Sequence, residues 1–177
     1  MDGRIQDERI LKLELRLAQL EKNEECQNTF LSFVKNIWPS FIQGRHHEII
    51  SEKLERVARG ELKRLIINMA PRHTKSEFAS FLFPAWMMGL NSSLKIIQAT
   101  HTAELAVRFG RRVRNIIDSE EYQHVFPNIS LSEDNKSAGR WTTDDGGEAF
   151  YSGVGGAITG RGADLLIIDD PHSEQDA

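Results

Sequence analysis

Cysteine is almost absent from this sequence: Cys26 is the only one among 177 residues. A single thiol excludes an internal disulfide and any zinc site built from several cysteines. Long apolar runs are absent too, and no stretch approaches the ~18 apolar residues that a membrane-spanning helix needs. The N-terminus lacks the apolar core of a signal peptide. We therefore expect a cytoplasmic protein with no membrane attachment.

The sequence also lacks an excess of positive charge. It has 22 Lys and Arg against 26 Asp and Glu, which gives a net charge of −4 at pH 7. Bulk charge therefore does not indicate a nucleic-acid partner, and any basic surface must be local. Hydrophobic residues are 40% and charged residues 27% of the chain, values that are ordinary for a globular domain with a core.

Glycine is missing from one place where it would be expected. The octapeptide MAPRHTKS, residues 69–76, ends in Lys-Ser as a phosphate-binding P-loop does, but Met69 and Thr74 stand at the two glycine positions of G-x-x-x-x-G-K-[ST]. A P-loop needs a strand, a tight loop and a helix N-terminus whose N–H groups bind phosphate. Its Lys reaches the β- and γ-phosphates and its Ser or Thr hydroxyl binds Mg²⁺. Taken alone, this octapeptide is a weak signal.

Hydrophobic periodicity predicts an α/β fold. Apolar runs indicate buried strands, and apolar residues spaced three and four apart indicate helices. Strands that alternate with helices favour a doubly wound, mostly parallel sheet with helices on both faces. The predicted strands are 62–70, 94–100, 149–155 and 163–170, and the predicted helices are 5–22, 29–59 with an interruption at Trp38-Pro39, 77–88 and 102–117.

The first of these helices carries a stripe formed by Ile10, Leu13, Leu17 and Leu20, and the pattern breaks after it. Two heptads are too few to identify a coiled coil. The helix could dock on its own domain or contact another subunit or partner, and both alternatives stay open. We assign residues 1–28 to this helix and a linker, and residues 29–177 to the α/β domain.

A second motif stands 93 residues after Ser76. The stretch LLIIDD is an apolar strand that ends in Asp169 and Asp170, the Walker B form, in which a carboxylate lies beside the Mg²⁺ bound by the P-loop. Arg161 precedes it in a glycine-rich loop that could bring a guanidinium to a phosphate. The joint occurrence of these motifs is far less probable by chance than either one alone.

These motifs and their flanking sequence resemble the ATPase domain of the large terminase subunit of tailed bacteriophages. The resemblance covers roughly residues 30–177 and rests on APRHTKSEFASFLFPAWMMG, on the stretch from QATHTAELAVRFGRRVRN onward, and on GVGGAITGRGADLLIIDD. Large terminases carry deviant Walker A loops, often with an Arg inside. On this reading PRHTKS is a recognised variant of the P-loop.

The resemblance implies a P-loop NTPase fold and roles for particular residues. Lys75 would contact ATP phosphates, Ser76 and Asp169 would hold Mg²⁺, and Asp170 would stand where the family usually has a catalytic Glu. Arg161 would be an arginine finger. Candidate nucleotide contacts are Arg72, His73 and Thr74 in the loop, and Trp38, Phe41, His46 and His47 near the adenine, although each aromatic is at least as compatible with core packing.

The implied function is ATP hydrolysis that drives DNA into a procapsid, in the cytoplasm of an infected bacterial host. Double-stranded DNA, the portal protein, a small terminase subunit and a homo-oligomeric ring are the partners the family implies. Arg108, Arg111 and Arg112, on one helix face, could touch DNA phosphate or a neighbouring subunit. The alternatives are a non-catalytic module that only docks to portal or DNA, and a helicase-like ATPase.

The family's later strands, coupling motif and nuclease domain are not in this sequence. We therefore expect a fold that is incomplete at its C-terminus, a sheet with an uncovered apolar face, slow ATP hydrolysis and no nuclease activity.

Overall fold

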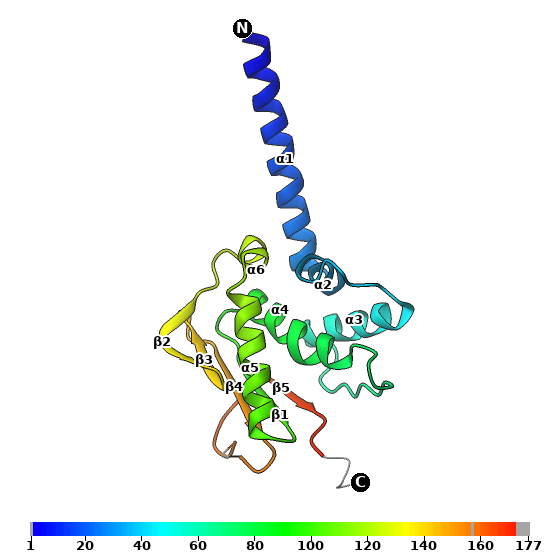
Figure 1. The fold of residues 1–177 in the computed structure, drawn as a ribbon, viewed down its shortest axis with the longest axis vertical. Coiled ribbons are helices and arrows are strands. Elements are labelled where there is room, and N and C mark those ends of the chain that lie inside the picture. The colour runs from blue at the N-terminus through cyan, green and yellow to red at the C-terminus, as the bar shows by residue number, and fades with distance from the viewer. Residues whose placement is uncertain (1, 157, 173–177) are drawn as a thin grey trace.

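A five-stranded mixed sheet forms the centre of the computed structural model, which describes residues 2–156 and 158–172 (Figure 1). The strand order is β2-β3-β4-β1-β5. β1 is parallel to both β4 and β5, whereas β3 is antiparallel to both of its neighbours. The strands are β1 (Lys95–Thr100), β2 (Leu131–Ser137), β3 (Arg140–Thr143), β4 (Glu148–Gly153) and β5 (Leu165–Asp169).

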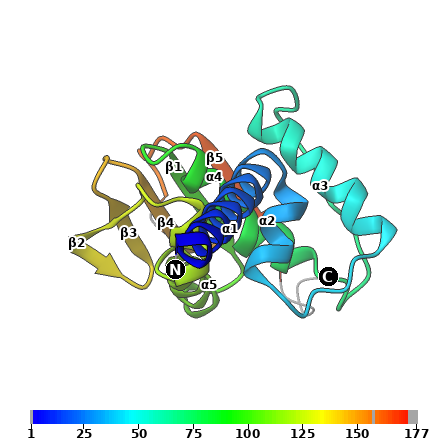
Figure 2. The ribbon, with the colours of Figure 1, turned by 90° about the horizontal axis from the view of Figure 1, so that it is seen from above.

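Helices flank this sheet, and one of them stands clear of it. The N-terminal helix α1 projects from the body as a single straight rod (Figure 1). Viewed along α1, the strands β2 and β3 lie at one side of the body and α3 at the other (Figure 2). The helices are α1 (Asp2–Asn28), α2 (Phe30–Ile37), α3 (Arg45–Ala58), the π-helical η1 (Glu77–Leu82), α4 (Phe83–Leu90), α5 (Ala103–Ile117) and α6 (Glu120–Val125).

The helix that follows residues 69–76 contains a π-helical segment. Pro84 has no N–H to donate and would disrupt a regular α-helix. In η1 the N–H of Phe83 reaches the carbonyl of Phe78, five residues back, so the wider turns accommodate the proline at the start of α4. Such π-segments are frequent at functional sites.

The core lies between the sheet and the helices on one of its faces. Residues 30, 33, 78, 83 and 86 form a cluster of aromatic rings, and α5 packs on the sheet face that carries Ala149 and Tyr151. The indole N–H of Trp141 donates to the carbonyl of Gly110 at 3.1 Å, which joins β3 to α5. Burial of these aromatic side chains is the main stabilising contribution.

The strand β5 is covered on one face only. Leu165 packs against the core, whereas Leu166 and Ile168, on the other face, are 58% and 59% exposed. This agrees with the expected uncovered apolar face. The prediction of helices on both faces of the sheet is therefore wrong at β5: within residues 2–156 and 158–172, helices cover only one of its faces.

Several sequence predictions are confirmed and some are wrong. Three predicted helical regions are present, near 29–59, 77–88 and 102–117. Three predicted strands are also present, near 94–100, 149–155 and 163–170. The predicted strand 62–70 is not: this segment pairs with no described strand, and Ile66 is 85% exposed. The prediction of a mostly parallel sheet is wrong: the sheet is mixed, because β2 and β3 form an antiparallel hairpin that the sequence did not reveal. The first helix runs on to Asn28, through the segment where a break was expected.

No helix in the described ranges is long and apolar enough to cross a membrane.

Candidate nucleotide-binding site

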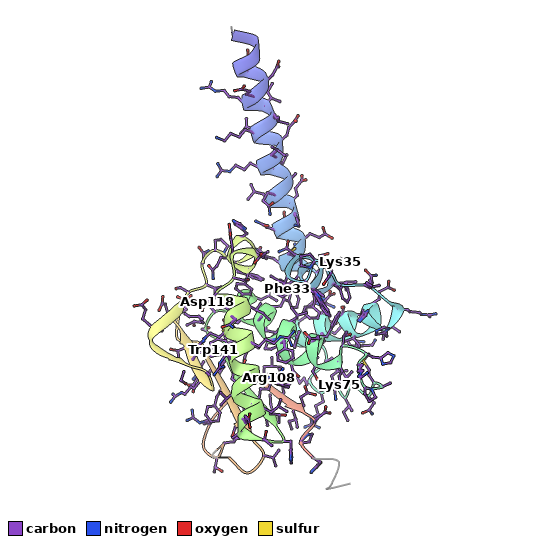
Figure 3. All side chains as sticks on the ribbon, viewed as in Figure 1. Phe33, Lys35, Lys75, Arg108, Asp118 and Trp141 are labelled. Carbon is purple, nitrogen blue, oxygen red and sulfur yellow. The ribbon has the colours of Figure 1, made fainter. Side chains whose placement is uncertain are left out.

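The loop before η1 meets the end of β5 through one lysine. Lys75 Nζ lies 2.5 Å from Asp170 Oδ1 and 3.4 Å from Asp169 Oδ1. These contacts join parts of the chain that lie 95 residues apart. Partial burial opposes the charge on Lys75, but the two carboxylates outweigh it and raise the pKa of Lys75. The lysine is therefore held as a cation at the carboxyl end of the sheet (Figure 3).

The two aspartates occupy different environments. Asp169 is 6% exposed, and its Oδ2 accepts a hydrogen bond of 2.7 Å from the buried hydroxyl of Ser80. The side chain of Asp170 is 69% exposed, and its backbone has a positive φ of 44°. Asp169 is thus oriented by the protein, whereas Asp170 faces solvent and is bound by Lys75.

Ser80 is a site residue that the sequence analysis missed. It lies one helical turn after Ser76 and its hydroxyl contacts the predicted Walker B carboxylate. Since residues four apart lie on one helix face, the spacing of Ser76 and Ser80 was the available signal.

A cavity of about 620 Å³ opens beside Lys75. It is lined by the backbone and side chains of the loop, by one aromatic ring and by a carboxylate at the end of β5. The lining residues are Trp38, Met69, Ala70, Pro71, Arg72, His73, Thr74, Lys75, Ser76, Glu77 and Asp170.

The loop has left-handed backbone at two residues that are not glycine. Arg72 and Thr74 both have φ of 65°, a conformation that is unfavourable for a β-branched residue such as Thr. Thr74 stands at the second glycine position of the P-loop pattern. The chain therefore adopts there the backbone conformation that glycine normally supplies.

His47 holds Thr74 in this conformation. Its Nδ1 accepts from the N–H of Gly44 at 2.8 Å, so Nε2 carries the proton and donates to Thr74 Oγ1 at 2.7 Å. The Thr74 hydroxyl then donates to the carbonyl of His73 at 2.5 Å. Burial, followed by the charge of His46, lowers the pKa of His47, which keeps the ring neutral as this chain of bonds requires.

The predicted adenine-binding residues separate into two groups. Trp38 lines the cavity and donates its indole N–H to Ser40. His46 is exposed, with its ring centroid 6.1 Å from that of His73, and the Nδ1 of His73 lies 2.9 Å from the carbonyl of Pro71. Phe41 and His47 instead pack against Phe78, with ring centroids 5.5 and 4.9 Å away. In this structure Phe41 and His47 therefore pack against Phe78, and His47 also contacts Thr74 in the loop.

Arg161 lies away from the cluster of Lys75, Asp169 and Asp170. Its Nη1 is 3.0 Å from Glu148 Oε1, and its guanidinium carbon is 4.1 Å from the ring centre of Phe150. Glu148 begins β4, whereas Asp169 ends the parallel array. Arg161 therefore binds its own chain at the amino-terminal side of the sheet.

The arginines of α5 also differ in their environments. Arg112 forms a two-pronged ion pair with Glu77, with Nη1 2.7 Å from Oε1, and lies over the ring of Phe81. It therefore ties α5 to the helix that begins at the loop. Arg108 and Arg111 are exposed, and the side chain of Arg112 is 49% exposed despite its ion pair with Glu77.

The chain matches no protein-family model, no curated protein and no solved structure. Among the residues that the structure describes, no group of three or more His, Cys, Asp and Glu side chains could hold a metal ion.

Proposed function

We propose that the chain is the ATPase part of a phage DNA-packaging motor, with a P-loop NTPase fold. The observation that carries this proposal is the contact of Lys75 with Asp169 and Asp170. A lysine at a helix start, beside two carboxylates at the end of a parallel strand, is one part of the arrangement of a Walker A and Walker B pair. The strand that normally leads into a Walker A loop is not formed by residues 62–70. The resemblance of residues 30–177 to large terminases supports the assignment to a packaging motor.

The loop supports phosphate binding through its backbone as well as its lysine. Positive φ at Arg72 and Thr74 gives the loop the alternating backbone that makes N–H groups converge into anion-binding nests. Lys75 begins the helix that continues as η1, so the helix N-terminus adds its partial positive charge. Arg72 and His73, in the lining of the cavity, add further donors.

The donor set fits Mg²⁺. Ser76 offers a hydroxyl and Asp169 a carboxylate, and hard oxygen ligands of this kind, completed by phosphate and water, are typical of Mg²⁺ in nucleotide sites. The bond from Ser80 orients the Asp169 carboxylate. When bound, Mg²⁺ would neutralise charge on the β- and γ-phosphates.

Hydrolysis would begin when Lys75 transfers its contact from Asp170 to the phosphates. This frees the exposed Asp170 carboxylate to accept a proton from a water molecule. The water oxygen bonds to the γ-phosphorus while the bond from that phosphorus to the β–γ bridging oxygen breaks, which yields ADP and phosphate. Lys75 stabilises the charge on the transferred group.

In the motor, ATP turnover would drive double-stranded DNA into a procapsid. The portal protein, a small terminase subunit and further copies in a ring are the partners we propose. We propose that Arg108 and Arg111, which are exposed on α5, contact the DNA phosphates.

The test is thermal unfolding with and without Mg-ATP. A ligand at 100 times its Kd stabilises the folded state by about 2.7 kcal/mol, which raises the melting temperature of a domain of this size by roughly 5–11 °C. Lys75→Ala should abolish the shift, whereas Lys95→Ala, at the other end of the sheet, should preserve it. An equal shift in wild type and Lys75→Ala would refute the proposal.

A non-catalytic docking module is the second candidate. One observation favours it: Asp170, the residue at the position of the catalytic base, is bound to Lys75. Phosphate release from ATP, measured alongside the thermal shift, separates the two candidates. A nucleotide-induced shift without turnover, in a preparation that also contains DNA and portal, would favour the docking module.

A further inference from the structure

The N-terminal part of α1 lies outside the hydrophobic core. Its last residues attach it to the body: Cys26 is buried, Asn23 Nδ2 donates to the carbonyl of His124 at 2.7 Å, and Gln27 Nε2 donates to the carbonyl of Val125 at 2.6 Å. Every side chain from 6 to 22 is exposed. These residues span about 25 Å of helix, and their side chains point into solvent on all sides (Figure 3).

This projecting segment is rich in leucine. Its exposed apolar residues are Ile10, Leu11, Leu13, Leu15, Leu17 and Leu20, each 51% to 67% exposed. A short helix without tertiary packing is only marginally stable in water, and a row of exposed leucines favours association. A partner that covers the row would both bury apolar surface and stabilise the helix.

The row follows a coiled-coil pattern. With Ile10 and Leu17 at heptad position a, Leu13 and Leu20 fall at position d. Of the two a positions, Ile10 is β-branched and Leu17 is not; a β-branched residue at a with leucine at d favours two-stranded coiled coils. Leu11 and Leu15 fall at b and f, on the other side of the helix.

The charges beside this seam are self-complementary in one orientation only. Arg9 and Arg16 fall at position g, and Glu14 and Glu21 fall at position e. In a parallel pair of helices each g residue faces the e residue five positions later on the partner. Arg9 then faces Glu14 of a second copy and Arg16 faces Glu21, whereas an antiparallel pair places arginine against arginine and glutamate against glutamate.

We infer that α1 pairs with α1 of a second copy of this chain as a parallel, two-stranded coiled coil. The seam is Ile10, Leu13, Leu17 and Leu20, flanked by the two Arg–Glu pairs on each side of the twofold axis. A membrane surface would select Lys and Arg along the polar face, and the acidic residues beside this seam disfavour that. Two heptads make a weak, concentration-dependent contact that acts together with any other interface between the copies.

The test uses sedimentation of the full chain over a range of concentrations, with two charge variants. Arg9→Glu/Arg16→Glu places Glu at both g and e, and Glu14→Arg/Glu21→Arg places Arg at both. Each variant alone should dimerise at least about tenfold more weakly than wild type, because like charges then face each other. An equimolar mixture should recover dimerisation, because every facing pair is again Arg with Glu.

Both substitutions exchange good helix formers, so circular dichroism should show unchanged helix content in the monomer. A second, independent pair of variants tests the seam itself. Leu13 and Leu15 are 67% and 64% exposed, but only Leu13 belongs to the seam. Leu13→Gln should weaken association, whereas Leu15→Gln should leave it unchanged.

Orientation is tested by cysteine cross-linking in a chain whose single native Cys26 is buried. In a parallel dimer in register, Leu20→Cys lies against its own copy and should form a disulfide under mild oxidation. In an antiparallel dimer Leu20 faces Ile10, so only a mixture of Leu20→Cys and Ile10→Cys would cross-link. That second result would overturn the parallel arrangement.

Three outcomes would overturn the pairing as a whole. They are a chain that stays monomeric up to roughly 1 mM, a dimer that survives both charge variants unchanged, and a dimer that Leu13→Gln and Leu15→Gln weaken equally. None of them bears on nucleotide binding, which the Lys75→Ala comparison tests separately.

Discussion

His47 Nε2 lies 2.7 Å from Thr74 Oγ1, and this bond fixes the residue that stands at a glycine position of the P-loop pattern. Thr74 has φ of 65°, a conformation that costs about 1–3 kcal/mol for a residue other than glycine. The surrounding contacts must compensate for that cost. His47, stacked on Phe78 and bonded to Gly44, provides a rigid partner.

We predict that His47 and Thr74 are energetically coupled. His47→Ala should lower the free energy of unfolding by about 1–3 kcal/mol, because a buried donor is lost and the Gly44 N–H loses its acceptor. In a Thr74→Gly background the loss should be smaller, since Gly adopts positive φ without strain and has no hydroxyl to hold. Urea unfolding of the four proteins gives the coupling energy, expected at about 0.5–3 kcal/mol. Strictly additive effects would contradict it.

The same histidine predicts a pH dependence of stability. Burial and His46 lower the pKa of His47, whereas the unfolded chain titrates near ~6.5. Between these two pKa values the unfolded state binds more protons, so the free energy of unfolding rises with pH. The contribution is complete above about pH 6.5 and is lost as the pH falls below it.

His47→Gln removes this titration while keeping a donor near the position of Nε2. Urea unfolding at about pH 5.5 and pH 7.5 should therefore show a larger difference between wild type and His47→Gln at the higher pH. The chain has 6 histidines. Taking the difference between the two proteins cancels the four that do not act on His47, so the remaining pH dependence comes from His47 and its neighbour His46. A difference that does not change with pH would exclude His47 as the source.

Asp169 and Asp170 should differ in how much each contributes to the free energy of unfolding. Asp169→Ala should cost about 1–3 kcal/mol of stability, because the buried hydroxyl of Ser80 loses its acceptor. Asp170→Ala should cost less than about 1 kcal/mol, because an ion pair with an exposed member is weak. If Asp170 is the catalytic base, Asp170→Asn should also keep the Mg-ATP-induced thermal shift while phosphate release falls. Equal destabilisation by the two alanine variants would contradict the assigned environments.

The sequence predicted the parts of the fold that local patterns determine. Strand β5 and helix α5 were found because apolar runs and three-to-four spacing are local signals, and Thr102 caps α5 by accepting from the N–H of Leu105. The prediction of a strand at 62–70 was wrong, because an apolar run forms a strand only where another strand pairs with it, and pairing is not a local property. The hairpin of β2 and β3 was not predicted, because its strands carry few apolar residues and so give no strand signal in the sequence.

The site divides in the same way. The joint occurrence of two motifs in the sequence predicted that Lys75 lies close to Asp169 and Asp170. The strand 62–70 expected to lead into Lys75 is not formed, so the helix start at Lys75 reaches the end of β5 without it. The role of His47 was not: nothing in the sequence indicates that its ring faces the loop rather than a ligand. The position of Arg161 was equally hidden, because a glycine-rich loop constrains its own path very little.

Arg161 supports one prediction about assembly. Within its own chain it is bound by Glu148 and Phe150 and does not reach the site of Lys75. If it acts as an arginine finger, it must therefore act on the site of a neighbouring copy or leave Glu148 first. Fingers supplied by a neighbour contribute roughly 10³–10⁵ in rate.

Mixing two inactive variants separates these alternatives. Arg161→Ala keeps Lys75, and Lys75→Ala keeps Arg161, so a mixed assembly contains some interfaces with both residues intact. ATP hydrolysis should then partly recover if the finger acts between copies, and Arg161→Ala alone should still show the thermal shift with Mg-ATP. Arg140→Ala removes the other arginine on Glu148, 2.9 Å from its Oε1, and serves as a control that should hydrolyse ATP normally. Mixed assemblies that contain both variants and remain inactive would refute a finger that acts between copies.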